Sequence, residues 1–174
     1  MLSITLMRVG RIYLPYKRVK TPAAIAVISD HEQLNYQALH EQSGQIAVYL
    51  QKQGVLADTI VALSVPRSLA MIVSVVGILK AGAAYLPIDA DLPEDRIKTL
   101  LTDSGCRFFL TTQAIAESIS DVLAELRCQV VCIDADWPKI LAARGELVQS
   151  GRPNDLAYLI YTSGSTGQPK RCDD

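Results

Sequence analysis

Several features are missing from this sequence, and each absence excludes a class of protein. The 174 residues carry a formal net charge of −1, so no excess of charge points to nucleic acid or to an anionic membrane as a partner. The longest apolar run, residues 68–79 between Arg67 and Lys80, is too short to cross a bilayer and is typical of a buried helix. We therefore expect a protein that binds neither nucleic acid nor membrane.

Signals of secretion and of metal binding are also missing. Arg8 and Arg11 interrupt the apolar N-terminal stretch, and no small-residue cleavage site follows it. No two of the four cysteines have CxxC spacing, and neither His31 nor His40 lies near them in the sequence, so we predict no metal ligands and give neither histidine a chemical role. Reduced thiols in a cytoplasmic chain are the simplest interpretation. The cysteines are Cys106, Cys128, Cys132 and Cys172.

Hydrophobic residues make up 49% of the chain, which is enough for one domain with a core. Short apolar runs alternate with longer segments of helical period. Strands are predicted over residues 24–28, 33–36, 60–65, 83–89, 107–111, 129–134 and 156–161, and helices over 37–53, 68–80, 94–103 and 114–126. This alternation predicts an α/β fold: a doubly wound, mostly parallel sheet with helices on both faces.

Other segments carry weaker signals. Residues 1–19 have no clear period, residues 136–138 are predicted as a turn, and residues 149–154 as a loop. Asn35 is expected to cap the helix that Gly54 ends. The carboxylates near residue 90 are expected to serve a loop and a helix start rather than catalysis, and we predict no catalytic residue. These carboxylates are Asp89, Asp91, Glu94 and Asp95.

The segment 156–170 joins a strand to a loop of unusual composition. After the apolar run, residues 162–167 contain only Gly, Ser and Thr. The N–H groups and hydroxyls of such a loop can converge on one anion, and a phosphate fits best. A flexible turn is the alternative, but the preceding strand and the following Pro-Lys pair favour a phosphate loop. It is not a Walker A loop, because Gly167 is followed by Gln168 rather than by Lys.

The run Tyr-Thr-Ser-Gly-Ser-Thr-Gly-x-Pro-Lys at residues 161–170 resembles the signature loop of the adenylate-forming, AMP-binding enzymes. These include the adenylation domains of nonribosomal peptide synthetases, acyl-CoA synthetases and luciferases. In that family the loop holds the β- and γ-phosphates of ATP while a carboxylate attacks the α-phosphate. The resemblance implies a nucleotide site made by Thr162, Ser163, Gly164, Ser165, Thr166, Gly167 and Lys170.

Two further segments extend the resemblance. Residues 79–89, Leu-Lys-Ala-Gly-Ala-Ala-Tyr-Leu-Pro-Ile-Asp, are similar to the family's second core motif, and residues 34–39 are similar to its first. The second motif looks more like a peptide-synthetase adenylation domain than an acyl-CoA synthetase. Arg171 departs from the family, which has glycine there. The resemblance divides the chain into a poorly matching segment, 1–19, and a partial adenylation domain, 20–174.

The resemblance implies ATP-dependent activation of an amino acid to aminoacyl-AMP, with ATP and Mg²⁺ as cofactors. Its partners would be the remaining synthetase chain or a carrier domain, whose phosphopantetheine thiol takes the aminoacyl group. The adenine, ribose and specificity motifs of the family lie beyond the segment that this sequence matches, so we expect the chain alone to be inactive. Three alternatives stay open: a non-enzymatic nucleotide-binding or interaction module, an inactive relic of a truncated gene, and a fragment of an acyl-CoA synthetase-like ligase.

Overall fold

The computed structural model describes residues 2–8, 22–29, 32–148 and 155–163, and it describes only the backbone of residues 2–8, 162 and 163. The strands are β1 Leu2–Arg8, β2 Ile25–Ser29, β3 Glu32–Asn35, β4 Ile60–Ser64, β5 Ala84–Pro87, β6 Phe108–Thr111, β7 Gln129–Cys132 and β8 Leu156–Ser163. The helices are α1 Tyr36–Lys52, α2 Leu69–Lys80, α3 Glu94–Asp103, α4 Gln113–Ser118, α5 Ser120–Leu126 and α6 Trp137–Ala142.

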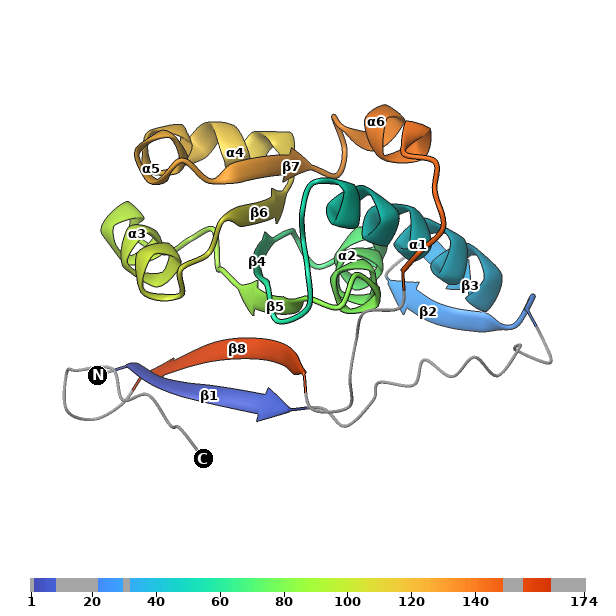
Figure 1. Cartoon of the computed structure of the whole chain (residues 1–174), viewed down its shortest axis with the longest axis horizontal. Coiled ribbons are helices and arrows are strands. Elements are labelled where there is room, and N and C mark those ends of the chain that lie inside the picture. The colour runs from blue at the N-terminus through green and yellow to red at the C-terminus, as the bar shows by residue number, and fades with distance from the viewer. Residues whose placement is uncertain (1, 9–21, 30–31, 149–154, 164–174) are drawn as a thin grey trace.

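One six-stranded sheet organises the chain, with the strand order β1-β8-β5-β4-β6-β7 (Figure 1). The five strands from β8 to β7 are parallel, and β1 runs antiparallel to β8. The second sheet pairs β2 with β3 and lies beside α1 and α2 (Figure 1). The predicted α/β class with a mostly parallel sheet is confirmed.

Helices cover both faces of the sheet. Successive side chains of an inner strand point to opposite faces, so each face presents apolar side chains that the helices bury. In β4, Val61 and Leu63 join the cluster formed with α1, α2 and α6, whereas Ala62 joins the cluster formed with α3 and α5. In β6, Phe109 lies on the opposite face from its neighbours Phe108 and Leu110. Apolar side chains at successive positions therefore fill two cores, as a strand buried on both faces requires.

The two longest helices begin at side-chain caps. Asn35 Oδ1 accepts a hydrogen bond from the N–H of Ala38 at 2.8 Å, as predicted, and Ser68 Oγ accepts from the N–H of Met71 at 3.3 Å. Both bonds satisfy donors that a helix start leaves without partners. No helix among the described residues has the length and apolarity that crossing a membrane requires.

Apart from small differences in the bounds of elements, the structure departs from the sequence-based prediction at three places. Residues 2–8 form a strand, so the prediction of no clear period there was wrong: Ser3 and Thr5 alternate with apolar neighbours at a period of two. The predicted helix 114–126 is broken at Ile119, whose φ of −121° and ψ of 25° are not helical. The predicted turn at 136–138 is the start of α6, where Pro138 fits the first helical turn.

Candidate functional site

The predicted phosphate loop begins where β8 ends. Thr162 and Ser163 are the last two residues of β8, which extends two residues beyond the predicted strand, and they pair with Ser3 and Leu2 of β1. The other predicted site residues, Gly164, Ser165, Thr166, Gly167 and Lys170, lie outside the described residues. The structure therefore places the beginning of the loop at the carboxyl end of a parallel strand, where ligands of such sheets bind.

The pairing with β1 limits which backbone groups of Thr162 and Ser163 are available. In an antiparallel pair, successive residues direct their N–H and C=O groups alternately toward the partner strand and away from it. One of these two residues therefore bonds to β1, and the other faces the β5 side. On that side, the pairing of β8 with β5 among the described residues is the one between Tyr158 and Tyr85, so no described strand engages an N–H group there.

A carboxylate fixes the start of β8. Asp58 Oδ1 accepts a hydrogen bond from the N–H of Leu156 at 2.8 Å, across 98 positions in the sequence. Asp58 has a φ of 61°, a left-handed conformation that Asp tolerates better than most residues. Its own N–H donates to the carbonyl of Gly82 at 3.2 Å. Asp58 thus joins the start of β8 to the turn that precedes β5.

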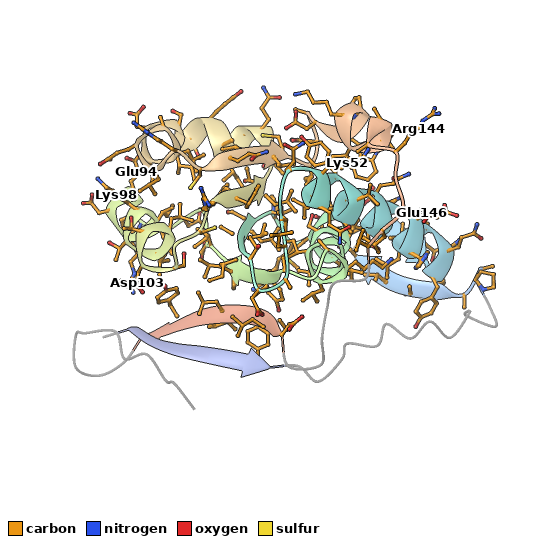
Figure 2. All side chains as sticks on the ribbon, in the orientation of Figure 1. Lys52, Glu94, Lys98, Asp103, Arg144 and Glu146 are labelled. Carbon is orange, nitrogen blue, oxygen red and sulfur yellow. The ribbon has the colours of Figure 1, made fainter. Side chains whose placement is uncertain are left out.

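A second carboxylate fixes the end of β8. The hydroxyl of Tyr161 donates to Asp103 Oδ2 at 2.8 Å, and Tyr161 also packs against the core cluster of α3 and α5. Asp103 is the last residue of α3, which lies beside the sheet above β8 in Figure 2. The residue immediately before the predicted loop is therefore held by its ring and by its hydroxyl.

The middle of β8 is held by packing. Ala157 and Leu159 are buried, and the ring of Tyr158 lies 5.8 Å from that of Tyr85, centroid to centroid, with 37° between their planes. Burial, and then Tyr158, raise the pKa of Tyr85, so its hydroxyl stays protonated at neutral pH. Since these contacts are distributed along the strand, β8 is a fixed base for the loop that follows it.

The carboxylates near residue 90 lie in a loop and at the start of a helix. Asp89 Oδ1 accepts from the N–H of Asp91 at 3.0 Å, and Glu94 and Asp95 lie in the first turn of α3. Neither arrangement resembles a catalytic pair. Within the described ranges, no three His, Cys, Asp or Glu side chains lie close enough together to hold a metal ion.

The described cysteines are free, and burial raises the pKa of each. Cys106 is the most buried of them, and its pKa rises to about 11. Cys172 and His31 lie outside the described residues. His40 is exposed.

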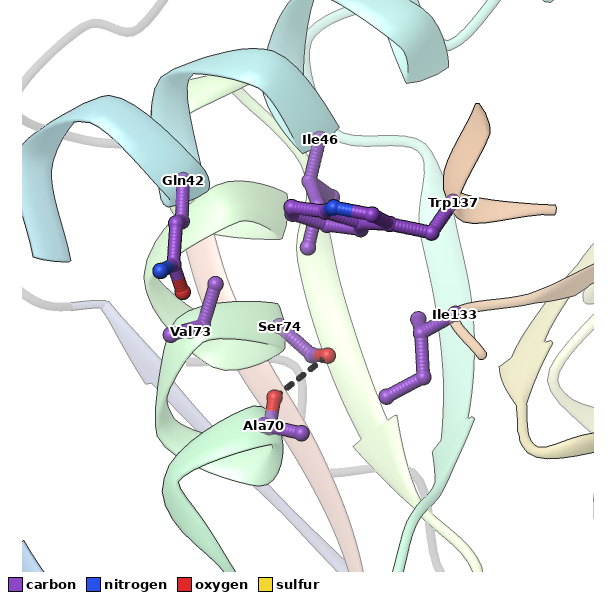
Figure 3. Close-up of a pocket in the computed structure, with 7 residues that line it drawn as sticks. All are labelled: Gln42, Ile46, Ala70, Val73, Ser74, Ile133 and Trp137. Carbon is purple, nitrogen blue, oxygen red and sulfur yellow. Dashed lines mark hydrogen bonds between the residues drawn. The ribbon is translucent and has the colours of Figure 1, made fainter. Parts of the chain in front are cut away.

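Two hollows are found on the described part of the chain. One, of about 300 Å³, lies where α1, α2 and α6 meet, and Trp137 extends from α6 toward the other two helices (Figure 3). The other, of about 500 Å³, is open and lies along α3, with Asp103 on its wall. The second is nearer to the predicted site, because Asp103 binds the residue that precedes the loop.

Asp58 and Asp103, the carboxylates that fix β8, could not be recognised from the sequence. Asp58 lies in a loop and Asp103 at the end of a helix, and neither position has a periodic or motif signal. Both contacts join residues 58 or more positions apart, so only the tertiary structure brings them together.

Comparison with known proteins identifies the family of the chain. The AMP-binding enzyme family matches residues 16–172, and the chain therefore belongs to that family. Bacitracin synthase 3 of Bacillus licheniformis is 48% identical over 151 residues, which are 87% of this chain and 2% of that protein. Zwittermicin A synthase ZmaJ of Bacillus cereus is 40% identical over 153 residues, which are 87% of this chain and 28% of that protein. The chain thus spans a small part of these relatives.

Solved structures are similar as well. The nonribosomal peptide synthetase FmoA3, in a form bound to α-methyl-L-serine-AMP, superposes with a TM-score of 0.73 at 33% identity, over 82% of this chain and 16% of that one. MatB from Rhodopseudomonas palustris superposes with a TM-score of 0.76 at 20% identity, over 93% of this chain and 34% of that one. The likeness to MatB bears on the fold alone.

Proposed function

We propose that this chain is the front part of an amino-acid adenylation domain, which converts ATP and an amino acid into aminoacyl-AMP and pyrophosphate for nonribosomal peptide synthesis. The observation that carries the proposal is the 48% identity to bacitracin synthase 3 over 151 residues. The 33% identity to the peptide synthetase FmoA3 supports an amino acid, rather than a fatty acid, as the substrate.

In the proposed reaction, a carboxylate oxygen of the amino acid attacks the α-phosphorus of ATP. The bond from that phosphorus to the bridging oxygen breaks, and pyrophosphate leaves with the electron pair. Catalysis of this type depends on positioning and on neutralising charge on the phosphate oxygens. The groups proposed to hold the β- and γ-phosphates are the hydroxyls and N–H groups of residues 162–167 and the ammonium of Lys170.

We propose Mg²⁺ as the cation that accompanies the nucleotide, where it would offset the charge of the phosphates. The phosphate oxygens would be its main ligands. In the described part of the chain, Asp58 and Asp103 are engaged in hydrogen bonds within the fold, so neither is proposed as a ligand of the ion.

The proposed partners are the remaining part of the synthetase and a carrier domain, whose phosphopantetheine thiol would take the aminoacyl group from AMP. We propose the cytoplasm as the compartment, because Cys106, Cys128 and Cys132 are free thiols and such thiols persist in a reducing environment.

A chimera tests the proposed function. This chain would replace the matching 151-residue segment in one adenylation domain of bacitracin synthase 3, and the amino-acid-dependent exchange of pyrophosphate into ATP would be measured. We expect the chimera to catalyse exchange with the amino acid that the host domain uses. The isolated chain, measured beside it, should give no exchange above a blank.

Two controls make the result interpretable. The host domain with this segment deleted should be inactive, so that any exchange depends on the inserted chain. A chimera that unfolds cooperatively at the temperature of the host domain but catalyses no exchange would overturn the proposed function.

A further inference from the structure

Lys80, the last residue of α2, directs its amine toward α1 rather than toward a carboxylate. Its Nζ donates to the backbone carbonyl of His40 at 2.8 Å and lies 3.1 Å from His40 Nδ1. The two ion pairs found among the described residues involve other lysines, Lys98 and Lys139. Lys80 is half-buried, so its amine is partly removed from water, and no carboxylate of the described residues pairs with it.

The contact defines the role of the His40 ring. An ammonium group has donors and no acceptor, so Nδ1 must accept from Lys80, and the ring proton of the neutral imidazole is on Nε2. Partial desolvation of the ring, and then the charge of Lys80, lower the pKa of His40. The imidazole therefore stays neutral at pH 7, and its Nδ1 keeps a lone pair directed at the amine.

His40 is the titratable group that touches this amine. The elements that pack against α2 are α1, β2, β3, β4 and β5, and β2 and β4 contain no titratable residue. Glu32 of β3 and Tyr85 of β5 form no hydrogen bond or ion pair with Lys80 in the described structure. On α1, Glu41 acts on His40, whose pKa it raises. Burial thus dominates, and it lowers the pKa of Lys80 to about 8.

We propose that Lys80 is a modification site, a nucleophilic amine that accepts acyl groups from mixed anhydrides of a carboxylic and a phosphoric acid, with His40 Nδ1 receiving its proton. The ammonium first gives one proton to His40 Nδ1, and the imidazole passes that proton on to water. The free electron pair on Nζ then attacks the acyl carbon, a C–N bond forms, and the C–O bond to the phosphate breaks. The phosphate leaves with the electron pair of the broken C–O bond. The second nitrogen proton passes to water, and the product is an amide.

This inference does not depend on the proposed function, although an aminoacyl-AMP belongs to the same chemical class.

Desolvated lysines are activated nucleophiles because more of the amine is neutral at physiological pH. At pH 7.5, a lysine with an ordinary pKa of about 10.4 has about one neutral amine in a thousand. With its pKa of about 8, the Lys80 amine is neutral in roughly one molecule in four at the same pH.

The test is acetylation of the full chain by acetyl phosphate at pH 7.5, followed by proteolysis and quantitative mass spectrometry of each lysine. The internal control is Lys139, which is exposed and whose pKa is raised by its hydrogen bond to Asp136. We expect the rate at Lys80 to exceed the rate at Lys139 at least fivefold. A smaller ratio would overturn the proposal. Lys80→Arg should remove the acetylation signal of the peptide that contains residue 80 and leave the signals of the other lysine peptides unchanged.

Variants of His40 test the transfer of the proton. His40→Phe keeps an aromatic cover over the amine, and His40→Gln keeps a polar group there, but neither has a basic nitrogen. Both should lower the rate at Lys80 at least threefold without changing the rate at Lys139. An unchanged Lys80 rate in a folded variant would show that His40 does not receive the proton. Since His40 is exposed on α1, circular dichroism should find both variants folded.

Discussion

The hydroxyl of Tyr161 donates to Asp103 Oδ2 at 2.8 Å and so joins the end of β8 to the end of α3. At the other end of the strand, Asp58 Oδ1 accepts from the N–H of Leu156. Two carboxylates from distant parts of the chain therefore fix the strand that leads into the predicted phosphate loop. Because the loop begins at Thr162, the position of its first residue depends on both contacts.

Tyr161→Phe should lower the free energy of unfolding by about 1 kcal/mol, because it removes one hydrogen bond and little apolar surface. The measurement is urea unfolding followed by circular dichroism. Tyr158→Phe is the matched control, since its ring packs on Tyr85 while no hydrogen bond of its hydroxyl is found in the described structure. Equal losses for the two variants would contradict the role given to Asp103.

Asp58 combines a left-handed backbone with a side-chain acceptor, and substitutions can separate the two. Asp58→Ala should lower the free energy of unfolding by about 1–3 kcal/mol, because it removes the acceptor and places a less tolerant residue at positive φ. Asp58→Asn keeps both properties and should change stability by less than about 0.5 kcal/mol. If Asp58→Asn destabilises as much as Asp58→Ala, then the acceptor and the backbone conformation do not explain the role of Asp58.

Gly77 lies where α2 packs against Ile46 and Ser43 of α1. A Cβ atom there would lie 2.7 Å from Ile46 Cγ2 and 3.2 Å from the carbonyl oxygen of Ser43. Gly77→Ala should therefore destabilise the protein by about 1–3 kcal/mol, even though alanine favours a helix. Gly44→Ala on α1 meets nothing within 4 Å and should stabilise it by up to about 1 kcal/mol. Thermal unfolding of the two variants should shift in opposite directions, and shifts of the same sign would contradict this packing.

Cys106 makes stability depend on alkaline pH. Burial raises its pKa from 9.0 to about 11 in the folded chain, so the thiol stays protonated in the fold at a pH where it ionises in the unfolded chain. Its contribution is fully present below about pH 9 and is lost as the pH rises toward 11. Urea unfolding at pH 7.5 and pH 10 should show a larger loss for the natural chain than for Cys106→Ala. Equal losses would contradict the assignment.

Much of the fold could be predicted from local patterns. The bounds of α3 were predicted as the structure has them, because Pro93 and two carboxylates mark its start and Gly105 follows its end. The cap at Asn35 was predicted for the same kind of reason. The break at Ile119 was not, because residues 115, 119, 122 and 126 continue one helical period across it. In the structure, Ile119 is buried against α3 and α5 although its backbone is not helical.

The candidate site was predicted from the composition of a loop and from the position of that loop after a strand. The structure confirms the strand. The contacts that hold that strand could not be predicted. The pairing of β8 with β1 joins the two ends of the described chain, and the Asp58 and Asp103 contacts are equally distant in sequence. Such contacts depend on the topology of the whole sheet, which local periodicity does not determine.

The central claim is that residues 162–167 hold the phosphates of ATP, and the kinetics of loop variants in the chimera test it most directly. Ser165→Ala and Thr166→Ala should lower kcat/KM for ATP about a hundredfold when combined, while KM for the amino acid stays within twofold. Thr102→Ala, on the exposed face of α3, is the matched control and should change neither constant. A loop variant that leaves kcat/KM for ATP unchanged, or that raises KM for the amino acid alone, would contradict the account.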